Sequence, residues 1–190
     1  MTWVYADPPY PGKAHLYRDH ADYAGEVDHG GLVQRLVDAR ATGLVDGWAL
    51  STSARSLPAV LELLNGLEAD LIVAAWVKGA HPHGKPHGPA QAWEPVIVSG
   101  CRHGLWRPDA LTHGAKARTT DPRRVIGAKP ARFCGWLFEL FGALPGDTLV
   151  DMFAGSDGVG RAWLEWSGAP AVASLDDLES SRKTVTHVPQ

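Results

Sequence analysis

The residues best suited to chemistry are Asp7-Pro8-Pro9-Tyr10, which directly follow the strand-like run 2–6. Two consecutive prolines fix φ and keep the preceding residue extended, so this loop is stiff. The Asp7 carboxylate and the Pro8 carbonyl both accept hydrogen bonds, which suits an exocyclic –NH₂ group with two donors. The Tyr10 ring can stack on the flat base that carries such an amine. We therefore predict a catalytic loop at the carboxyl end of a strand, where open α/β sheets bind ligands.

A second candidate site is the run D-M-F-A-G-S-D-G-V-G at 151–160. Residues 148–150 before it have strand character, and 161–166 after it open a helix. Strand, glycine-rich loop and helix in this order are typical of nucleotide-like ligand sites, because glycines let the backbone approach the ligand. This layout does not choose between a phosphate-bearing cofactor and S-adenosylmethionine. Asp176, after a strand expected at 171–175, is positioned to accept ribose hydroxyls.

Apolar runs between the two loops alternate between helix and strand patterns, which favours βαβ units in a mostly parallel sheet. The expected helices cover 32–41, 56–66 and 130–142, and the expected strands cover 48–53, 71–77 and 92–98. The stretch 79–91 is rich in Gly, Pro and His and has no helical pattern. We therefore expect strand 92–98 to pair antiparallel to its predecessor. Residues 100–128 show little periodicity and are expected to form loops.

Charge is distributed unevenly along the chain. The net charge is −3, yet residues 79–132 carry nine Lys/Arg and three acidic residues, a local balance of +6 that leaves −9 elsewhere. This asymmetry indicates a polyanionic partner for the basic stretch. The residues predicted to contact nucleic acid are Arg102, Arg107, Lys116, Arg118, Arg123 and Arg124. The alternative interpretation is a solvated basic loop.

Length and composition fit one domain, with 190 residues, 45% of them hydrophobic and 21% charged. No apolar run approaches the roughly 20 residues that cross a bilayer, and the N-terminus lacks a basic signal-peptide region. We therefore expect a cytoplasmic protein that makes no membrane contact. The only cysteines, Cys101 and Cys134, fit a reducing compartment. The histidines at 81, 83, 87 and 103 match no standard zinc spacing, so no metal site is predicted.

Together, D-P-P-Y at 7–10 and D-M-F-A-G-S at 151–156 resemble the β class of S-adenosylmethionine-dependent amino-methyltransferases of DNA, including small methylases of phages and bacteria. The stretches 93–96 and 129–163 also match this family. The resemblance implies a Rossmann-like α/β methyltransferase fold, with a mostly parallel, seven-stranded sheet and a reversed last strand. It implies a single methyltransferase domain over 1–190, in which 79–128 form a basic, loop-rich insertion.

The resemblance also implies roles for individual residues. Asp7 and the Pro8 carbonyl would hold the target amine, and Tyr10 would stack on a base flipped out of duplex DNA. The implied cofactor-binding residues are Lys129, Pro130, Phe133, Asp151, Phe153, Ala154, Gly155, Ser156 and Asp176. Family members methylate adenine N6 or cytosine N4, and D-P-P-Y favours adenine. A homodimer is compatible with the resemblance.

Two features depart from the family pattern. Asp157 replaces the second glycine of F-x-G-x-G, and its carboxylate would lie near the carboxylate of the cofactor. The chain also has no separate target-recognition domain, so the basic stretch or a partner must recognise the target. Three alternatives therefore stay open: methylation of cytosine N4, methylation of RNA, and a non-catalytic nucleic-acid-binding module that has lost its cofactor.

Overall fold

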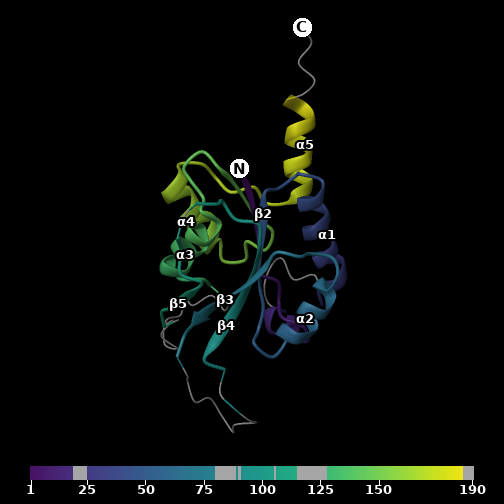
Figure 1. The fold of residues 1–190 in the computed structure, drawn as a ribbon, viewed down its shortest axis with the longest axis vertical. Helices are drawn as coiled ribbons and strands as arrows, with labels where there is room; N and C mark the ends of the chain where they lie inside the picture. The colour runs from purple at the N-terminus through teal and green to yellow at the C-terminus, as the bar shows by residue number, and fades with distance from the viewer. Residues whose placement is uncertain (19–24, 80–88, 90, 105, 115–127, 186–190) are drawn as a thin grey trace.

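The computed structural model describes residues 1–18, 25–79, 89, 91–104, 106–114 and 128–185. A six-stranded sheet lies between two layers of helices (Figure 1). Its strands are β1 (Thr2–Ala6), β2 (Gly47–Ser51), β3 (Leu71–Val77), β4 (Trp93–Ser99), β5 (Ala110–Thr112) and β6 (Thr148–Asp151). The helices are η1 (Ala14–Tyr17), α1 (His29–Ala41), α2 (Leu57–Leu64), α3 (Ala131–Phe141), α4 (Gly158–Ser167) and α5 (Leu175–Val185). None of the described helices is long and apolar enough to cross a membrane.

The strand order across the sheet is β5-β3-β4-β2-β1-β6. β1 lies between β2 and β6 and pairs parallel with both of them. β4 runs antiparallel to both of its neighbours, β2 and β3. The prediction that strand 92–98 is antiparallel to strand 71–77 is therefore confirmed. Antiparallel strands do not need the helical crossover that parallel neighbours require.

The α/β, Rossmann-like fold class is confirmed, and two details of the expected sheet differ. The reversed strand is β4, inside the sheet, and not the last strand of the chain. The strand expected at 171–175 is reduced to one parallel bridge between Val150 and Val172, so the described sheet has six strands. Ser174 explains this difference. Its Oγ accepts the Asp177 N–H at 3.1 Å and donates to the Asp177 carboxylate, a capping arrangement that begins α5.

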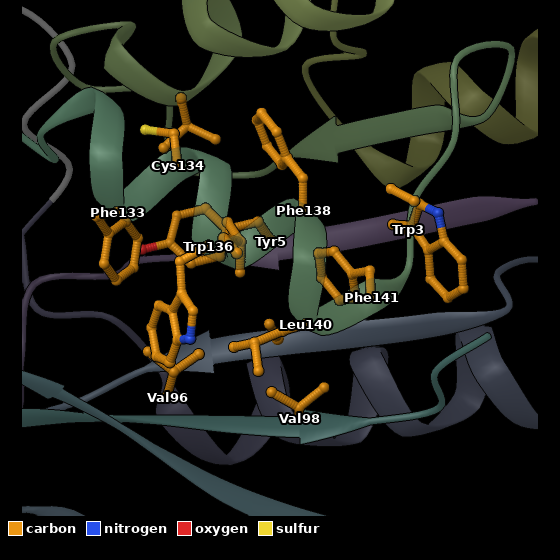
Figure 2. Close-up of a cluster of buried hydrophobic side chains, with 14 of the residues drawn as sticks. Trp3, Tyr5, Val96, Val98, Phe133, Cys134, Trp136, Phe138, Leu140 and Phe141 are labelled. Atoms are coloured by element: carbon orange, nitrogen blue, oxygen red, sulfur yellow. The ribbon is translucent and has the colours of Figure 1, made fainter. Parts of the chain in front are cut away.

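Large aromatic side chains fill the space between the sheet and the α3–α4 layer (Figure 2). Trp3 of β1 stacks on Phe141 of α3, with ring centroids 5.2 Å apart. Phe133, at the start of α3, contacts Tyr5 and Trp76 at centroid distances of 6.1 and 4.8 Å. Such aromatic pairs contribute about 0.5–1.5 kcal/mol each beyond the area they bury. The aromatic cluster therefore fixes β1 and its carboxyl end relative to the beginning of α3.

One buried carboxylate, Asp147, holds the opposite, amino-terminal edge of the central strands together. It accepts hydrogen bonds from the Met1 ammonium at 2.8 Å, the Trp3 indole at 3.1 Å, the Arg102 guanidinium at 2.7 Å and the Leu144 N–H at 2.9 Å. Burial by itself would raise the pKa of Asp147, but these donors outweigh burial and hold the pKa well below its usual range. The ionised carboxylate is therefore the form that stabilises the fold.

Asp147→Asn should lower the free energy of unfolding at pH 7 by about 2–4 kcal/mol, because buried donors lose their charged acceptor. The pKa of Asp147 is lower in the folded protein than in the unfolded chain. Its ionised carboxylate therefore stabilises the fold fully above the unfolded pKa of about 4, and this stabilisation is lost as the pH falls below that value. The difference in the free energy of unfolding between wild type and Asp147→Asn should therefore be smaller at pH 3 than at pH 7. Urea unfolding at both pH values measures it, with exposed Asp38→Asn as the matched control. Equal destabilisation at pH 7 and pH 3 would contradict the electrostatic role.

Candidate active site

Two loops that are far apart in the sequence meet at the carboxyl end of the central parallel strands. Tyr5 of β1 pairs with Asp151 of β6, so Asp7 and the loop 152–157 leave the sheet from neighbouring strands. The Met152 N–H donates to the Tyr5 carbonyl oxygen at 3.0 Å, which continues the pairing into the loop. The structure thus brings the two predicted loops to the edge where open α/β sheets bind ligands.

Asp7 is held by Lys129, which lies just before α3. The Lys129 Nζ atom lies 2.9 Å from each carboxylate oxygen of Asp7, and the lysine side chain is only 7% exposed. The ammonium also lies 5.6 and 5.5 Å from the ring centroids of Trp76 and Phe133. Burial raises the pKa of Asp7, and the charge of Lys129 only partly offsets that effect. Both carboxylate oxygens thus already face one buried cation.

A second acidic residue, Glu94 of β4, shares this cation. Its carboxylate lies 3.7 Å from Lys129 Nζ and also forms an ion pair with Lys78, just after β3. Lys78 Nζ lies 4.8 Å from the ring centroid of Trp76, the residue paired with Glu94 across the two strands. Negative and positive charges therefore alternate through Asp7, Lys129, Glu94 and Lys78. Sequence reasoning assigned no role to Glu94 or Lys78, although the antiparallel pairing it predicted brings these two residues together.

The predicted catalytic loop, residues 7–10, is held by contacts within the loop and with the strands below it. Pro8 is buried and Tyr10 is half-buried, and the Tyr10 carbonyl accepts the Lys13 N–H at 2.8 Å in a turn. Beneath the loop, the hydroxyls of Tyr5 and Ser51 lie 2.8 Å apart and link the ends of β1 and β2. Burial raises the pKa of Tyr5 well above its usual value, so Tyr5 stays neutral and acts as a structural support.

The predicted cofactor loop begins with a buried carboxylate that lacks a partner in the described part of the chain. Neither side-chain oxygen of Asp151 accepts a hydrogen bond from the described residues. Burial raises the pKa of Asp151 to about 6, and the nearby N–H groups of Phe153 and Gly160 offset burial only in part. The following residues, Ala154 and Gly155, are exposed, and Gly155 has a φ of +50°. A buried acceptor beside exposed backbone suits a ligand that brings N–H or O–H donors.

Asp157 adopts a left-handed conformation, with φ of +56° and ψ of +26°. It has the only positive φ among the described non-glycine residues. A glycine would adopt this conformation readily, and Asp is one of the few other residues that tolerate it. Its side chain lies against the first turn of α4, because a Cβ at Gly160 would be 2.4 Å from Asp157 Oδ1. Asp157 therefore takes the conformation that a glycine would adopt at this position, with its carboxylate at a helix N-terminus that favours negative charge.

Other predicted cofactor residues have partners within the fold. Phe133 is fully buried in the aromatic cluster, and Pro130 precedes the first residue of α3. The Ser156 carbonyl accepts a hydrogen bond from Arg161 at 3.2 Å. Asp176 lies in the first turn of α5, with its side chain 76% exposed, and forms an ion pair with Arg35 of α1. The expected contact between Asp176 and ribose stays a prediction.

The residues predicted to contact nucleic acid fall into two groups. Four of them lie outside the described residues: Lys116, Arg118, Arg123 and Arg124. Arg102 and Arg107 follow β4, which runs antiparallel to its neighbours, so they leave the sheet at the edge opposite Asp7. Arg102 binds Asp147, and Arg107 donates to the Leu140 carbonyl at 3.1 Å. Both arginines thus have structural partners, and their contact with nucleic acid stays a prediction.

Asp151→Asn should raise the free energy of unfolding at pH 8 by about 2–3 kcal/mol, because it removes a buried charge without a partner. Because the pKa of Asp151 is raised to about 6 in the folded protein, the free energy of unfolding of the wild type falls as the pH rises from about 4 through 6. The gain should therefore vanish at pH 4. Urea unfolding at pH 4 and pH 8 measures it, with exposed Asp70→Asn as the control. A variant less stable than wild type at pH 8 would contradict the unpartnered state of Asp151.

Comparison with known proteins identifies the fold. No protein-family model matches the sequence, and a search of curated proteins finds no match. The crystal structure of the M1.HpyAVI–SAM complex matches with a TM-score of 0.53 at 15% identity, over 97% of this chain and 88% of that chain. TTHA0409 from Thermus thermophilus, a proposed DNA modification methylase, matches with a TM-score of 0.51 at 17% identity, over 99% and 88%. The chain therefore has the Rossmann-like α/β fold of these two proteins.

Proposed function

We propose that this protein is an S-adenosylmethionine-dependent DNA methyltransferase that modifies adenine at N6. The observation that carries the proposal is the adjacency of the D-P-P-Y loop, residues 7–10, and the glycine-rich loop 152–157 at the ends of neighbouring parallel strands. Acceptors for an amine and a loop for a nucleotide-like ligand thus share one edge of the sheet. The fold is also that of M1.HpyAVI, solved with SAM, and of a proposed DNA modification methylase.

The residues of the glycine-rich loop fit such a cofactor. Asp151 offers a buried acceptor without a partner among the described residues, and Ala154 and Gly155 leave their backbone open to a ligand. Lys129 and Phe153 are proposed to border the same site. The cofactor would supply a methyl group carried on a positively charged sulfur. The protein itself has to bind, orient and shield the reacting groups.

Asp7 and the Pro8 carbonyl oxygen are proposed to accept the two N–H donors of the target amine. This contact would direct the nitrogen lone pair towards the methyl carbon, and orientation of this kind supplies a large part of the rate. A strong base is not needed, because the nitrogen would become positively charged and acidic as the N–C bond forms and the C–S bond breaks, and its proton could then pass to the Asp7 carboxylate or to water. In a duplex the base must leave the stack, and stacking on Tyr10 would contribute about 1–3 kcal/mol.

Methyl-labelled S-adenosylmethionine tests the proposal directly. The protein is incubated with the cofactor and mixed-sequence duplex DNA, and the DNA is then digested to nucleosides. Label in N6-methyladenosine supports the proposed reaction, whereas label in N4-methylcytosine would redirect it to cytosine. A parallel reaction with RNA distinguishes the two nucleic acids. Absence of label in every substrate would reject a nucleic-acid methyltransferase.

A non-catalytic nucleic-acid-binding module is the second candidate, because Asp157 brings negative charge to a glycine position of the cofactor loop. The retained left-handed turn and the complete D-P-P-Y loop favour the enzyme over this module. Calorimetry with S-adenosylmethionine separates the two. Binding by the wild-type protein supports the enzyme, whereas binding that requires Asp157→Gly supports the module.

Asp7→Ala should abolish methyl transfer but change the affinity for S-adenosylmethionine only within a few-fold, because Asp7 is proposed to contact the target amine. Labelled transfer and calorimetry measure the two quantities on the same preparation. Asp38→Ala, an exposed change on α1, serves as the control and should keep both. Equal loss of cofactor binding in Asp7→Ala would show that the D-P-P-Y loop does not lie where the amine binds.

The DNA is proposed to lie along the same edge of the sheet. The His113 N–H donates to the Val77 carbonyl at 3.0 Å at the end of β3, and Lys129 binds Asp7, so the segment between them begins and ends at this edge. Its predicted phosphate contacts are Lys116, Arg118, Arg123 and Arg124. Their positions in the chain make these four better candidates than Arg102 and Arg107, which bind groups within the fold.

Affinity for DNA should therefore fall steeply with salt. Four phosphate contacts give a slope of about −4 for log K against log salt concentration, and Arg123→Gln should reduce the slope by about one. Arg107→Gln is the matched comparison and should leave the slope unchanged. Fluorescence anisotropy between about 50 and 200 mM salt measures both slopes. Affinity independent of salt, or a slope altered only by Arg107→Gln, would reject this surface.

A further inference from the structure

The position proposed for the target amine is already occupied by a group of the protein. Lys129 Nζ is a nitrogen with three N–H donors, and it lies 2.9 Å from both carboxylate oxygens of Asp7. An exocyclic amine would need at least one of the same two oxygens. A carboxylate oxygen can accept more than one hydrogen bond, but an amine that binds either oxygen would share it with the ammonium, which weakens the contact between Lys129 and Asp7.

Lys129 cannot move away from the Asp7 carboxylate without cost, because its side chain is buried and a buried ammonium needs negative charge nearby. The Glu94 carboxylate is 3.7 Å from Lys129 Nζ, just beyond hydrogen-bond distance. A small movement of the ammonium away from Asp7 would bring it into contact with Glu94. The Trp76 ring beside both groups gives the cation an attractive surface along that movement.

Glu94 is itself held in place. It lies on β4 directly opposite Trp76 of β3. Lys78, which directly follows β3, forms an ion pair with it. The Trp76 and Phe133 rings contact each other and both lie beside the Lys129 ammonium, so these parts of its surroundings are fixed by the core. The acceptor therefore has a defined position before any substrate arrives.

We propose that Glu94 is a positioning residue that accepts Lys129 when the target amine takes its place on Asp7. This inference rests on the proposed function, since it assigns Asp7 to the amine. Glu94 acts through Lys129 and does not touch the substrate. A purely structural ion pair would stabilise the fold without selectively affecting use of the nucleic acid, so the two interpretations differ in a measurable way.

The first test compares Glu94→Gln with Glu68→Gln. Glu68 forms a partly buried ion pair with Arg40, so its variant makes the same chemical change away from Asp7. Glu94→Gln should lower kcat/KM for duplex DNA about 10- to 100-fold, the effect of losing one charge-assisted contact. Its affinity for S-adenosylmethionine should stay within a few-fold, and Glu94→Asp should recover part of the loss. Glu68→Gln should keep kcat/KM, and an equal loss there would overturn the inference.

The second test does not depend on methyl transfer. The charged and titratable groups that act on Asp7 are Lys129, Glu94, Lys78, Tyr5 and Asp151. Carbon-13 NMR titration of the Asp7 carboxyl should give a lower pKa in Glu94→Gln, which removes a negative charge, and a higher pKa in Lys129→Met, which removes the counter-ion. An Asp7 pKa unaffected by Glu94→Gln would overturn the coupling. If wild-type protein transfers no methyl group, the proposed function fails, and this titration alone decides whether Glu94 and Asp7 communicate.

Discussion

The contact between Lys129 and Asp7 is the interaction on which the candidate active site depends. A carboxylate that must accept hydrogen bonds in a partly dehydrated site needs a nearby positive charge, because burial favours its neutral form. Lys129 can supply that charge only because α3 begins directly beside β1. The aromatic cluster, with Phe133 against Tyr5 and Trp76, fixes this position. The position of α3 therefore does two things: it packs Phe133 into the core, and it places the Lys129 ammonium beside the Asp7 carboxylate.

Much of this arrangement could be predicted from the sequence, because its signals are local. The stiff loop 7–10, the glycine-rich loop 151–160 and the helix at 130–142 are each encoded within a short stretch. Residues that act through distant partners were missed. Asp147 accepts hydrogen bonds from residues as distant in the sequence as Met1 and Arg102, and Glu94 comes close to Lys78 and Lys129 only when β4 pairs with β3. No periodic pattern within one segment carries such information.

The incorrect details also have identifiable causes. Residues 171–175 have strand composition, but the Ser174–Asp177 cap begins a helix there and leaves a single bridge. β5 is too short, at three residues, to show an alternating pattern. The reversal of β4 was predicted, but not its consequence. Because β4 runs antiparallel to its neighbours, Glu94 near its start lies at the same edge of the sheet as Asp7, and Arg102 beyond its end lies at the opposite edge.

The pairing of β1 with β6 also determines when the site can form. β1 can pair with β2 early in synthesis, whereas β6 and the glycine-rich loop emerge much later. At about 5–20 residues per second, Asp151 is synthesised roughly 7–29 s after Asp7. Pairings between distant segments also slow folding. Until residues 129–157 emerge, a nascent chain of this protein therefore carries its D-P-P-Y loop without the lysine and the glycine-rich loop that lie beside it in the folded protein.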